Sequence, residues 1–141
     1  MNYVERAKLR RFFTDEFKEI NKYIRDKMPD EHFFLKFSPH LVDRVIQRDI
    51  AYGHVIKLVR EMTNHCEEIY SFCKMVPLPK PGEPREDIEY RPLRLEVTDG
   101  NLWLGFTADP TNISPIGLLC RMAFYNPNRK PGKISTKLIK V

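Results

Sequence analysis

The feature that most constrains the fold is residues 93–106, LRLEVTDGNLWLGF. Apolar and polar residues alternate on both sides of Asp99-Gly100, which predicts two strands joined by a two-residue turn of type I′. Such a turn sets the register, and it predicts three apolar pairs on one face: Val97 with Leu102, Leu95 with Leu104, and Leu93 with Phe106. The other face would carry Arg94, Glu96, Trp103 and Thr107.

Helical patterns precede this hairpin. Residues 4–28 place apolar side chains at three- and four-residue spacing, which predicts an amphipathic helix that Pro29 ends; the stripe is Leu9, Phe13, Phe17, Ile20 and Ile24. A short strand is expected at 33–37. Ser38 then caps a second helix that runs to about Asp49, with Pro39 at its first position.

The rest of the chain is expected to alternate between sheet and loop after one more helix. Residues 53–64 predict a third helix, and a period of two at 67–76 predicts a strand. Four prolines at 77–84 predict a loop. Strands follow at 118–125 and 134–140; in the first, the expected core residues are Leu118, Cys120, Met122 and Phe124, while Leu119, Arg121, Ala123 and Tyr125 would point away.

We therefore predict a single α+β domain, residues 1–141, with N-terminal helices packed on one face of an antiparallel sheet. The second sheet face would present charged residues among aromatic rings: Trp103, Arg94, Glu96, Arg121 and Tyr125. RNA suits such a face, because bases stack on rings and cations hold phosphates. An ordinary solvent-facing surface remains the alternative.

Charge also favours a polyanionic partner. The formal net charge is +5, and no acidic residue follows Asp109 in a segment that carries Arg121, Arg129, Lys130, Lys133, Lys137 and Lys140. No apolar run approaches the ~20 residues of a membrane helix, so the cytoplasm is the expected location. Cys66, Cys73 and Cys120 are expected to be reduced thiols, with a zinc site that adds His65 as the alternative.

The polar face of the second predicted helix carries two candidate catalytic residues. In the second helix, His40 and Arg44 are four residues apart, so they are neighbours on the polar side. A histidine can move a proton to or from the 2′-hydroxyl or the leaving oxygen of RNA, and an arginine can bind the phosphate as its charge grows. Because RNA supplies its own nucleophile, this chemistry needs neither a metal nor another cofactor. A solvated surface pair is the alternative.

Three stretches of the sequence, KLRRFFTDEFKEIN, FSPHLVDRVIQRDI and EYRPLRLEVTDGNLWLGF, with the later CRM and RKPGK, resemble one known family. It is the RegB family of sequence-specific endoribonucleases of T-even-type bacteriophages. The resemblance runs from Lys8 to the C-terminus. It implies a RelE/YoeB-type fold, with helices against an antiparallel sheet.

The resemblance also implies an activity. Members of the family cut early phage messages within GGAG-type translation-initiation motifs, without a metal, and leave 2′,3′-cyclic phosphate and 5′-hydroxyl ends. The large RNA-binding protein of the small ribosomal subunit stimulates them. The partners expected here are therefore mRNA and that protein, in the cytoplasm of the infected host, with no DNA and no membrane.

Residue by residue, His40 and Arg44 match the functional histidine and arginine of the family. Arg60 stands where the family has a second functional histidine, and His65 either matches another histidine of the family or replaces the missing one in space. We expect both to act at the catalytic site as helpers of His40 and Arg44, with Arg60 able to bind phosphate. We expect the RNA-binding residues to be Arg48, Arg94, Trp103, Arg121, Arg129, Lys130 and Lys133. The rival hypotheses are a RelE-type mRNA interferase toxin and a non-catalytic RNA-binding translational repressor.

Overall fold

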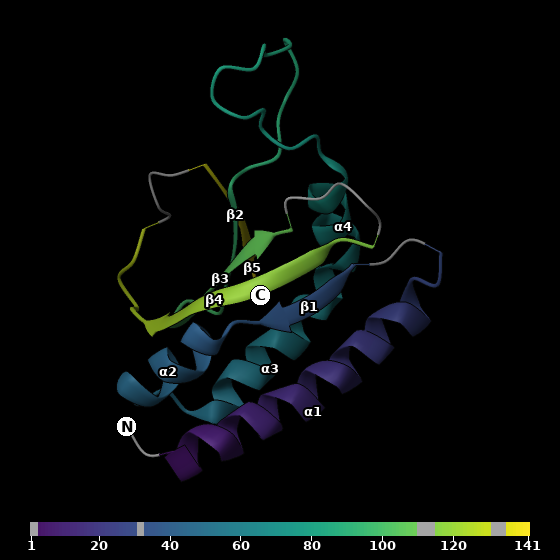
Figure 1. Ribbon diagram of the computed structural model, residues 1–141. Helices are drawn as coiled ribbons and strands as arrows, with labels where there is room; N and C mark the ends of the chain where they lie inside the picture. Colours follow the sequence, from purple (N-terminus) through teal and green to yellow (C-terminus); the bar gives the residue numbers. More distant parts are fainter. Residues whose placement is uncertain (1–2, 31–32, 110–114, 131–134) are drawn as a thin grey trace.

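The computed structural model describes residues 3–30, 33–109, 115–130 and 135–141, and it has helices packed against one sheet (Figure 1). The elements in chain order are α1 (Tyr3–Lys27), β1 (Phe34–Phe37), α2 (Pro39–Gln47), α3 (Tyr52–Met62), a 3₁₀ turn (Thr63–His65), α4 (Cys66–Lys74), β2 (Arg94–Thr98), β3 (Leu102–Ala108), β4 (Gly117–Tyr125) and β5 (Thr136–Lys140). The α+β class is confirmed. Among the described helices, none is long and apolar enough to cross a membrane.

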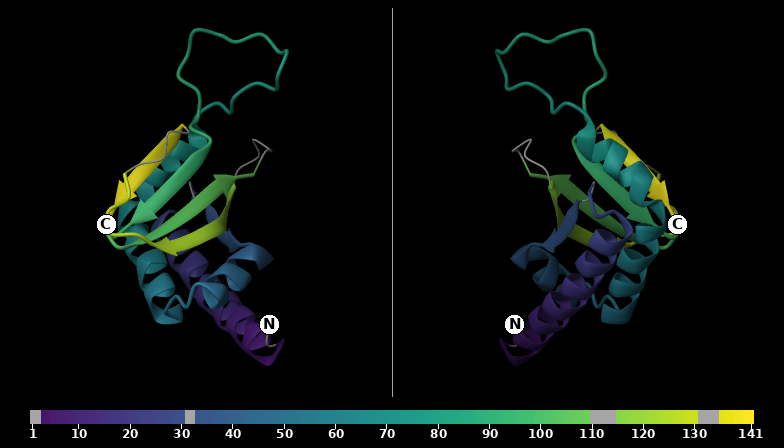
Figure 2. Two further views of the ribbon diagram at one scale, coloured as in Figure 1. Left: turned by 90° about the vertical axis from the view of Figure 1, so that its left-hand side faces the viewer. Right: turned by 90° about the vertical axis from the view of Figure 1, so that its right-hand side faces the viewer.

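The sheet has five strands in the order β1-β4-β3-β2-β5. Its central strands, β2, β3 and β4, are antiparallel as predicted, but β1 is parallel to β4 and β5 is parallel to β2. Parallel neighbours need long connections, and both edge strands are far in sequence from their partners. The sheet is therefore mixed. Figure 2 shows that α1 and α3 cover one face of it.

The β2–β3 turn differs from the prediction. Val97 pairs with Leu104 and Thr98 with Trp103, a shift of two residues from the predicted register. The Asp99 carboxylate accepts hydrogen bonds from the backbone N–H groups of Asn101 and Leu102, both at 2.9 Å. Gly100 has φ +96°, whereas a type I′ turn needs positive φ at Asp99 as well. Because the shift is two residues, the predicted apolar face is kept, except that Leu93 is exposed.

A β-bulge in β4 overturns the predicted alternation of that strand. Gly105 pairs with Met122 but Phe106 pairs with Cys120, so Arg121 is an extra residue. The bulge reverses the facing of every residue after it. Ala123 is fully buried, where the sequence predicted an outward residue, and Met122 and Phe124 are only partly buried.

The strand predicted at 67–76 is wrong, because this segment forms α4. Its buried residues recur at helical spacing and face the core: Cys66, Ile69, Phe72 and Cys73. Glu67 and Glu68 lie in the first turn, where the positive end of the helix dipole stabilises acidic side chains. The alternation that suggested a strand is a coincidence within a short apolar run.

Candidate active site

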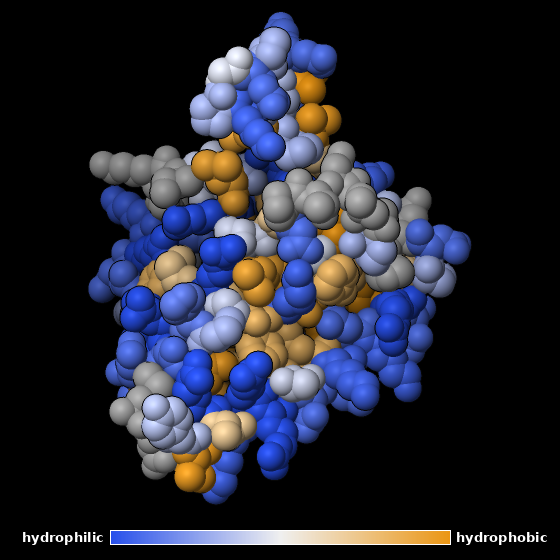
Figure 3. Space-filling model, viewed as in Figure 1, coloured by the Kyte–Doolittle hydropathy of each residue, from blue (hydrophilic) through white to orange (hydrophobic). Residues whose placement is uncertain are grey.

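The polar face of α2 borders a surface hollow of about 680 Å³. The other wall of the hollow comes from the sheet, on the face opposite to α1 and α3. Its lining is Ser38, His40, Arg44, Arg48, Arg94, Gly105, Phe106, Thr107, Leu119, Arg121 and Met122. The predicted pair His40 and Arg44 therefore meets arginines from three further positions. Figure 3 shows a largely hydrophilic surface on the side of α2.

Local sequence explains why His40 and Arg44 face the hollow. The Ser38 hydroxyl accepts a hydrogen bond from the backbone N–H of Leu41 at 3.1 Å, and Pro39 occupies the first turn, so the helix begins at a fixed residue. Its apolar side is buried against the core: Leu41, Val42 and Val45. His40, Arg44 and Arg48 are each four residues apart and so line the polar side.

Arg48 and Arg121 are oriented by neutral partners. One Arg48 nitrogen, Nη1, donates to the carbonyl of Ala123 at 2.9 Å and ties the end of α2 to β4. The Nε of Arg121 donates to the hydroxyl of Thr107 at 2.9 Å. Because Arg121 is the extra residue of the bulge, its side chain turns toward the hollow, as bulges next to functional sites often re-aim a side chain.

The hollow is positively charged. Arg44 donates from Nη1 to the Gln47 side chain at 3.1 Å, and neither it nor Arg48, Arg94 or Arg121 forms an ion pair with a carboxylate in the described part of the chain. An arginine without a carboxylate partner keeps its charge and hydrogen-bond donors for a phosphate. One imidazole, that of His40, lines the hollow with these four guanidinium groups.

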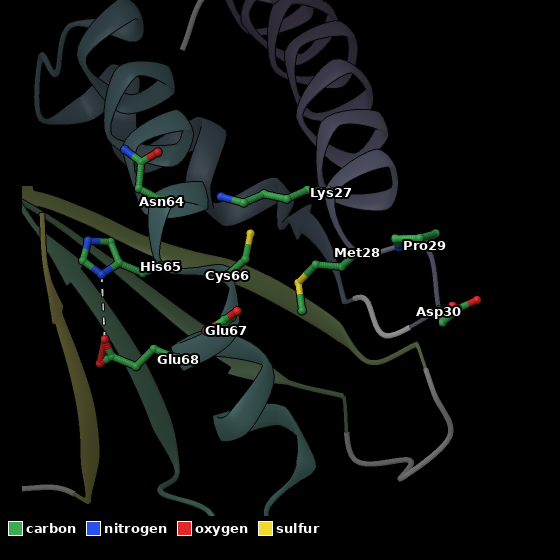
Figure 4. A pocket seen from close by; sticks show the side chains of 9 residues that line it. All are labelled: Lys27, Met28, Pro29, Asp30, Asn64, His65, Cys66, Glu67 and Glu68. Atoms are coloured by element: carbon green, nitrogen blue, oxygen red, sulfur yellow. Dashed lines mark ion pairs between the residues drawn. The ribbon is translucent and has the colours of Figure 1, made fainter.

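Arg60 and His65 do not line this hollow. Arg60 forms an ion pair with Glu16 of α1. His65 lies in a separate hollow of about 780 Å³ with Lys27 and Asn64, and its Nδ1 is 3.7 Å from the Glu68 carboxylate (Figure 4). The expectation that His65 replaces a missing histidine beside His40 is therefore not met by this geometry.

The second sheet face is less open than the sequence suggested. Trp103 is 4% exposed and donates from its indole N–H to the carbonyl of Asn126 at 2.9 Å. Glu96, expected on the surface, is 1% exposed and pairs with Arg129 at 2.9 Å. The Arg129 guanidinium lies 5.2 Å from the Trp103 ring centroid and 4.5 Å from that of Phe124. The expectation of an exposed Trp103 that stacks on a base is corrected: Arg129 covers the ring.

Neither of the two lysines predicted to bind RNA is among the described residues that line the hollow. Lys130 is exposed but does not line the hollow. Lys133 lies outside the described residues. Sequence reasoning missed the role of Thr107, which was assigned only to a sheet face, because the bulge that brings Arg121 to it has no signature in the alternation.

The described residues contain no group of three or more His, Cys, Asp or Glu side chains able to hold a metal ion. Cys66, Cys73 and Cys120 are free and buried. Burial raises the pKa of the Cys73 and Cys120 thiols to about 12, so these thiols are poor metal ligands and poor nucleophiles at neutral pH. The zinc alternative finds no site here.

Comparison with known proteins adds independent evidence. Residues 1–140 match the family described as T4-phage endoribonuclease RegB. Endoribonuclease RegB of Enterobacteria phage T4 is 45% identical over 144 residues, which cover 98% of this chain and 94% of that protein. The solution structure of the phage T4 enzyme superimposes with a TM-score of 0.67 over the same shares of the two chains.

Proposed function

Because this chain belongs to the RegB family of phage endoribonucleases, we propose that the hollow beside α2 cleaves messenger RNA within GGAG-type translation-initiation motifs. One observation carries the proposal: within the described residues, one imidazole and four guanidinium groups that form no ion pair with a carboxylate line the same hollow. A phosphodiester that enters it meets positive charge on both walls and a proton acceptor at one end.

The proposed chemistry uses the 2′-hydroxyl of the substrate. Neutral His40 takes the proton from this hydroxyl, and O2′ attacks the adjacent phosphorus. The P–O5′ bond breaks, and the leaving O5′ receives a proton from the imidazolium or from water. The products are a 2′,3′-cyclic phosphate and a 5′-hydroxyl. Arg44 binds the non-bridging oxygens, whose charge increases as O2′ bonds to phosphorus.

The other arginines are proposed to bind the RNA backbone. Arg48 extends the row of His40 and Arg44 along α2, while Arg94 and Arg121 face it from the sheet. Contacts of this kind fix the position of the strand but do not read its bases. Specificity for GGAG motifs, stimulation by the large RNA-binding protein of the small ribosomal subunit, and action in the cytoplasm of the infected bacterium rest on the family resemblance.

A direct test incubates the purified protein, in EDTA, with an RNA that contains one GGAG motif. We expect cutting at the motif, products that end in a cyclic phosphate, and no cutting of a matched RNA with a 2′-deoxy nucleotide at the cleavage position. Adding the ribosomal protein should raise the rate. Loss of all cutting in EDTA with recovery in Mg²⁺ would contradict the metal-free mechanism, and tight binding without any cutting would favour a repressor.

A further inference from the structure

Three side chains converge over Gly117, the first residue of β4. The Lys36 ammonium of β1 donates to both carboxylate oxygens of Asp109, each at 3.1 Å, and lies 5.4 Å from the ring centroid of Phe34. A Cβ atom at Gly117 would lie 2.8 Å from Lys36 Cε and from Phe34 Cζ, and closer still to the Asp109 carboxylate. Glycine is therefore what lets the three side chains meet here. None of these residues takes part in the proposed cleavage chemistry.

Strand pairing places this cluster on the sheet face that forms one wall of the hollow. Lys36 pairs with Leu119 and Leu119 with Thr107, and the last two line the hollow. Phe34 precedes Lys36 by two residues and Asp109 follows Thr107 by two, and side chains two residues apart along a strand point to the same face. The cluster therefore adjoins the lining of the hollow, displaced by roughly 7 Å along the strands.

The ion pair of Lys36 and Asp109 is partly open to solvent and can accept further hydrogen bonds. The two side chains are 42% and 29% exposed. A carboxylate offers about four lone-pair positions, and the ammonium uses one on each oxygen, so each oxygen can accept another hydrogen bond. The ammonium also offsets the carboxylate charge, which would otherwise repel the phosphates of a strand in the hollow. Asp109 is therefore suited to contact a base rather than the backbone.

We propose that Asp109 selects one unpaired guanine next to the cleaved phosphodiester. The Watson–Crick edge of guanine carries two adjacent donors, N1–H and N2–H, and the two carboxylate oxygens accept one hydrogen bond from each; adenine, cytosine and uracil have no such pair of donors on that edge. The partly exposed Phe34 ring packs against the base. Lys36 is a positioning residue, because it holds the carboxylate. This inference rests on the proposed function, which places RNA in the hollow.

The test measures binding of a GGAG-containing RNA made uncleavable by a 2′-deoxy nucleotide at the cleavage position, together with a series in which each guanine in turn is inosine. Inosine lacks only the N2 amino group, so at one position it should weaken binding to the natural protein about tenfold, the loss of one hydrogen bond to a charged group. Asp109→Asn should weaken binding of the guanine RNA by at least this factor, because its amide N–H faces a guanine donor. Inosine at that position should cost the Asp109→Asn protein nothing more, because the two changes remove one contact.

Further variants separate base selection from a structural role. Lys36→Met frees the carboxylate and should reduce the inosine penalty, whereas Lys36→Arg keeps the charge and the donors and should restore it. Phe34→Leu removes the ring and should weaken binding of the guanine and inosine RNAs equally. The matched control is Glu61→Gln, which removes a carboxylate that pairs with Lys57 on α3, outside the hollow, and should change neither the affinity nor the penalty. Each variant is checked for folding by circular dichroism.

The outcomes that overturn guanine selection differ from those that overturn the function. If the natural protein binds this RNA and cuts its all-ribose form, but every inosine penalty is the same in Asp109→Asn, only the selection by Asp109 is wrong. Loss of the penalty in Glu61→Gln would also overturn it, because a carboxylate outside the cluster would then have the same effect. Failure of the natural protein to bind the RNA overturns the selection and the proposed function together.

Discussion

Two sets of cations on this molecule differ in one respect, the identity of their partners. In the hollow, Arg44, Arg48 and Arg121 bond to a glutamine side chain, a carbonyl and a hydroxyl, all neutral. The second set consists of basic side chains outside the hollow that pair with carboxylates, such as Arg60 with Glu16 and Arg129 with Glu96. Overall net charge does not separate these sets, but their partners do.

This difference indicates which positively charged side chains are available to bind the phosphates of RNA. A guanidinium that already pairs with a carboxylate must give up that pair before it can bind a phosphate, whereas one oriented by a neutral group need not. The C-terminal segment looked basic in sequence, yet Arg129 is committed to Glu96. The cations therefore divide into a functional set, free to bind phosphate, and a structural set, already paired with carboxylates, and variants of each set test this division.

The largest expected effect is on catalysis in the hollow. His40→Ala should lower kcat about 10³-fold by removing the proton acceptor, and Arg44→Leu should lower it about 10²-fold by removing charge stabilisation of the phosphate. Single-turnover cleavage of a GGAG-containing RNA measures both rates. The matched control is His65→Ala, which removes a histidine paired with Glu68 outside the hollow and should leave the rate nearly normal. If His65→Ala lowers the cleavage rate as much as His40→Ala does, the division between functional and structural side chains is wrong.

The next effect concerns the structural set. Arg129→Gln should lower the free energy of unfolding by about 3 kcal/mol, because it leaves the Glu96 carboxylate buried without its partner. Urea denaturation measures the loss. The double variant with Glu96→Gln should recover part of the stability, since the uncompensated charge is gone. An Arg129→Gln protein of normal stability whose RNA binding is weakened would move Arg129 into the functional set.

A smaller effect is expected for the arginines that contact the backbone. Arg94→Gln and Arg121→Gln should each weaken RNA binding about tenfold and reduce the slope of log affinity against log salt by about 0.7, the value for one phosphate contact on a single strand. Binding to uncleavable RNA between ~50 and ~200 mM salt measures the slope. Lys57→Gln, which removes an exposed lysine paired with Glu61, is the control. An unchanged slope in both arginine variants argues against phosphate contacts.

The sequence was sufficient where local rules act alone. The stripe from Leu9 to Ile24, the Ser38 cap with Pro39, and the faces of the β2–β3 hairpin depend on short-range periodicity and capping, and the structure confirms all three. The polar face with His40 and Arg44 follows from the same periodicity. The part of the site that lies on α2 was therefore predictable.

The sheet side of the site was not predictable, because it depends on a bulge. One extra residue at Arg121 reverses the alternation after it, buries Ala123 and directs Arg121 toward Thr107. The segment that became α4 was misassigned because a short apolar run fits both periods, and packing decides between them. Burial of Trp103 beneath Arg129 depends on a contact between residues distant in sequence.

The smallest expected effect is a pH dependence at the hydrogen bond between His54 of α3 and Asp99 of the β2–β3 turn, where Nε2 lies 2.6 Å from the carboxylate. Burial acts to raise the pKa of Asp99, but the hydrogen bond to His54 and those from the backbone N–H groups of Asn101 and Leu102 outweigh it and lower that pKa below its usual value. A lowered pKa stabilises the folded protein above the pKa of the unfolded chain, about 3.9, and this stability is lost as pH falls through the folded-state value.

Asp99→Asn keeps the turn geometry, because its amide oxygen can accept the same backbone hydrogen bonds. It should therefore lower the free energy of unfolding at pH 7 by less than about 1 kcal/mol, a difference that disappears as the pH falls through the folded-state pKa of Asp99. Denaturation of both proteins across pH measures this, with His54→Gln as the companion variant that removes the imidazole side of the same hydrogen bond. A difference that increases toward low pH would mean that Asp99 is destabilising as a carboxylate, and that this pair does not belong to the structural set.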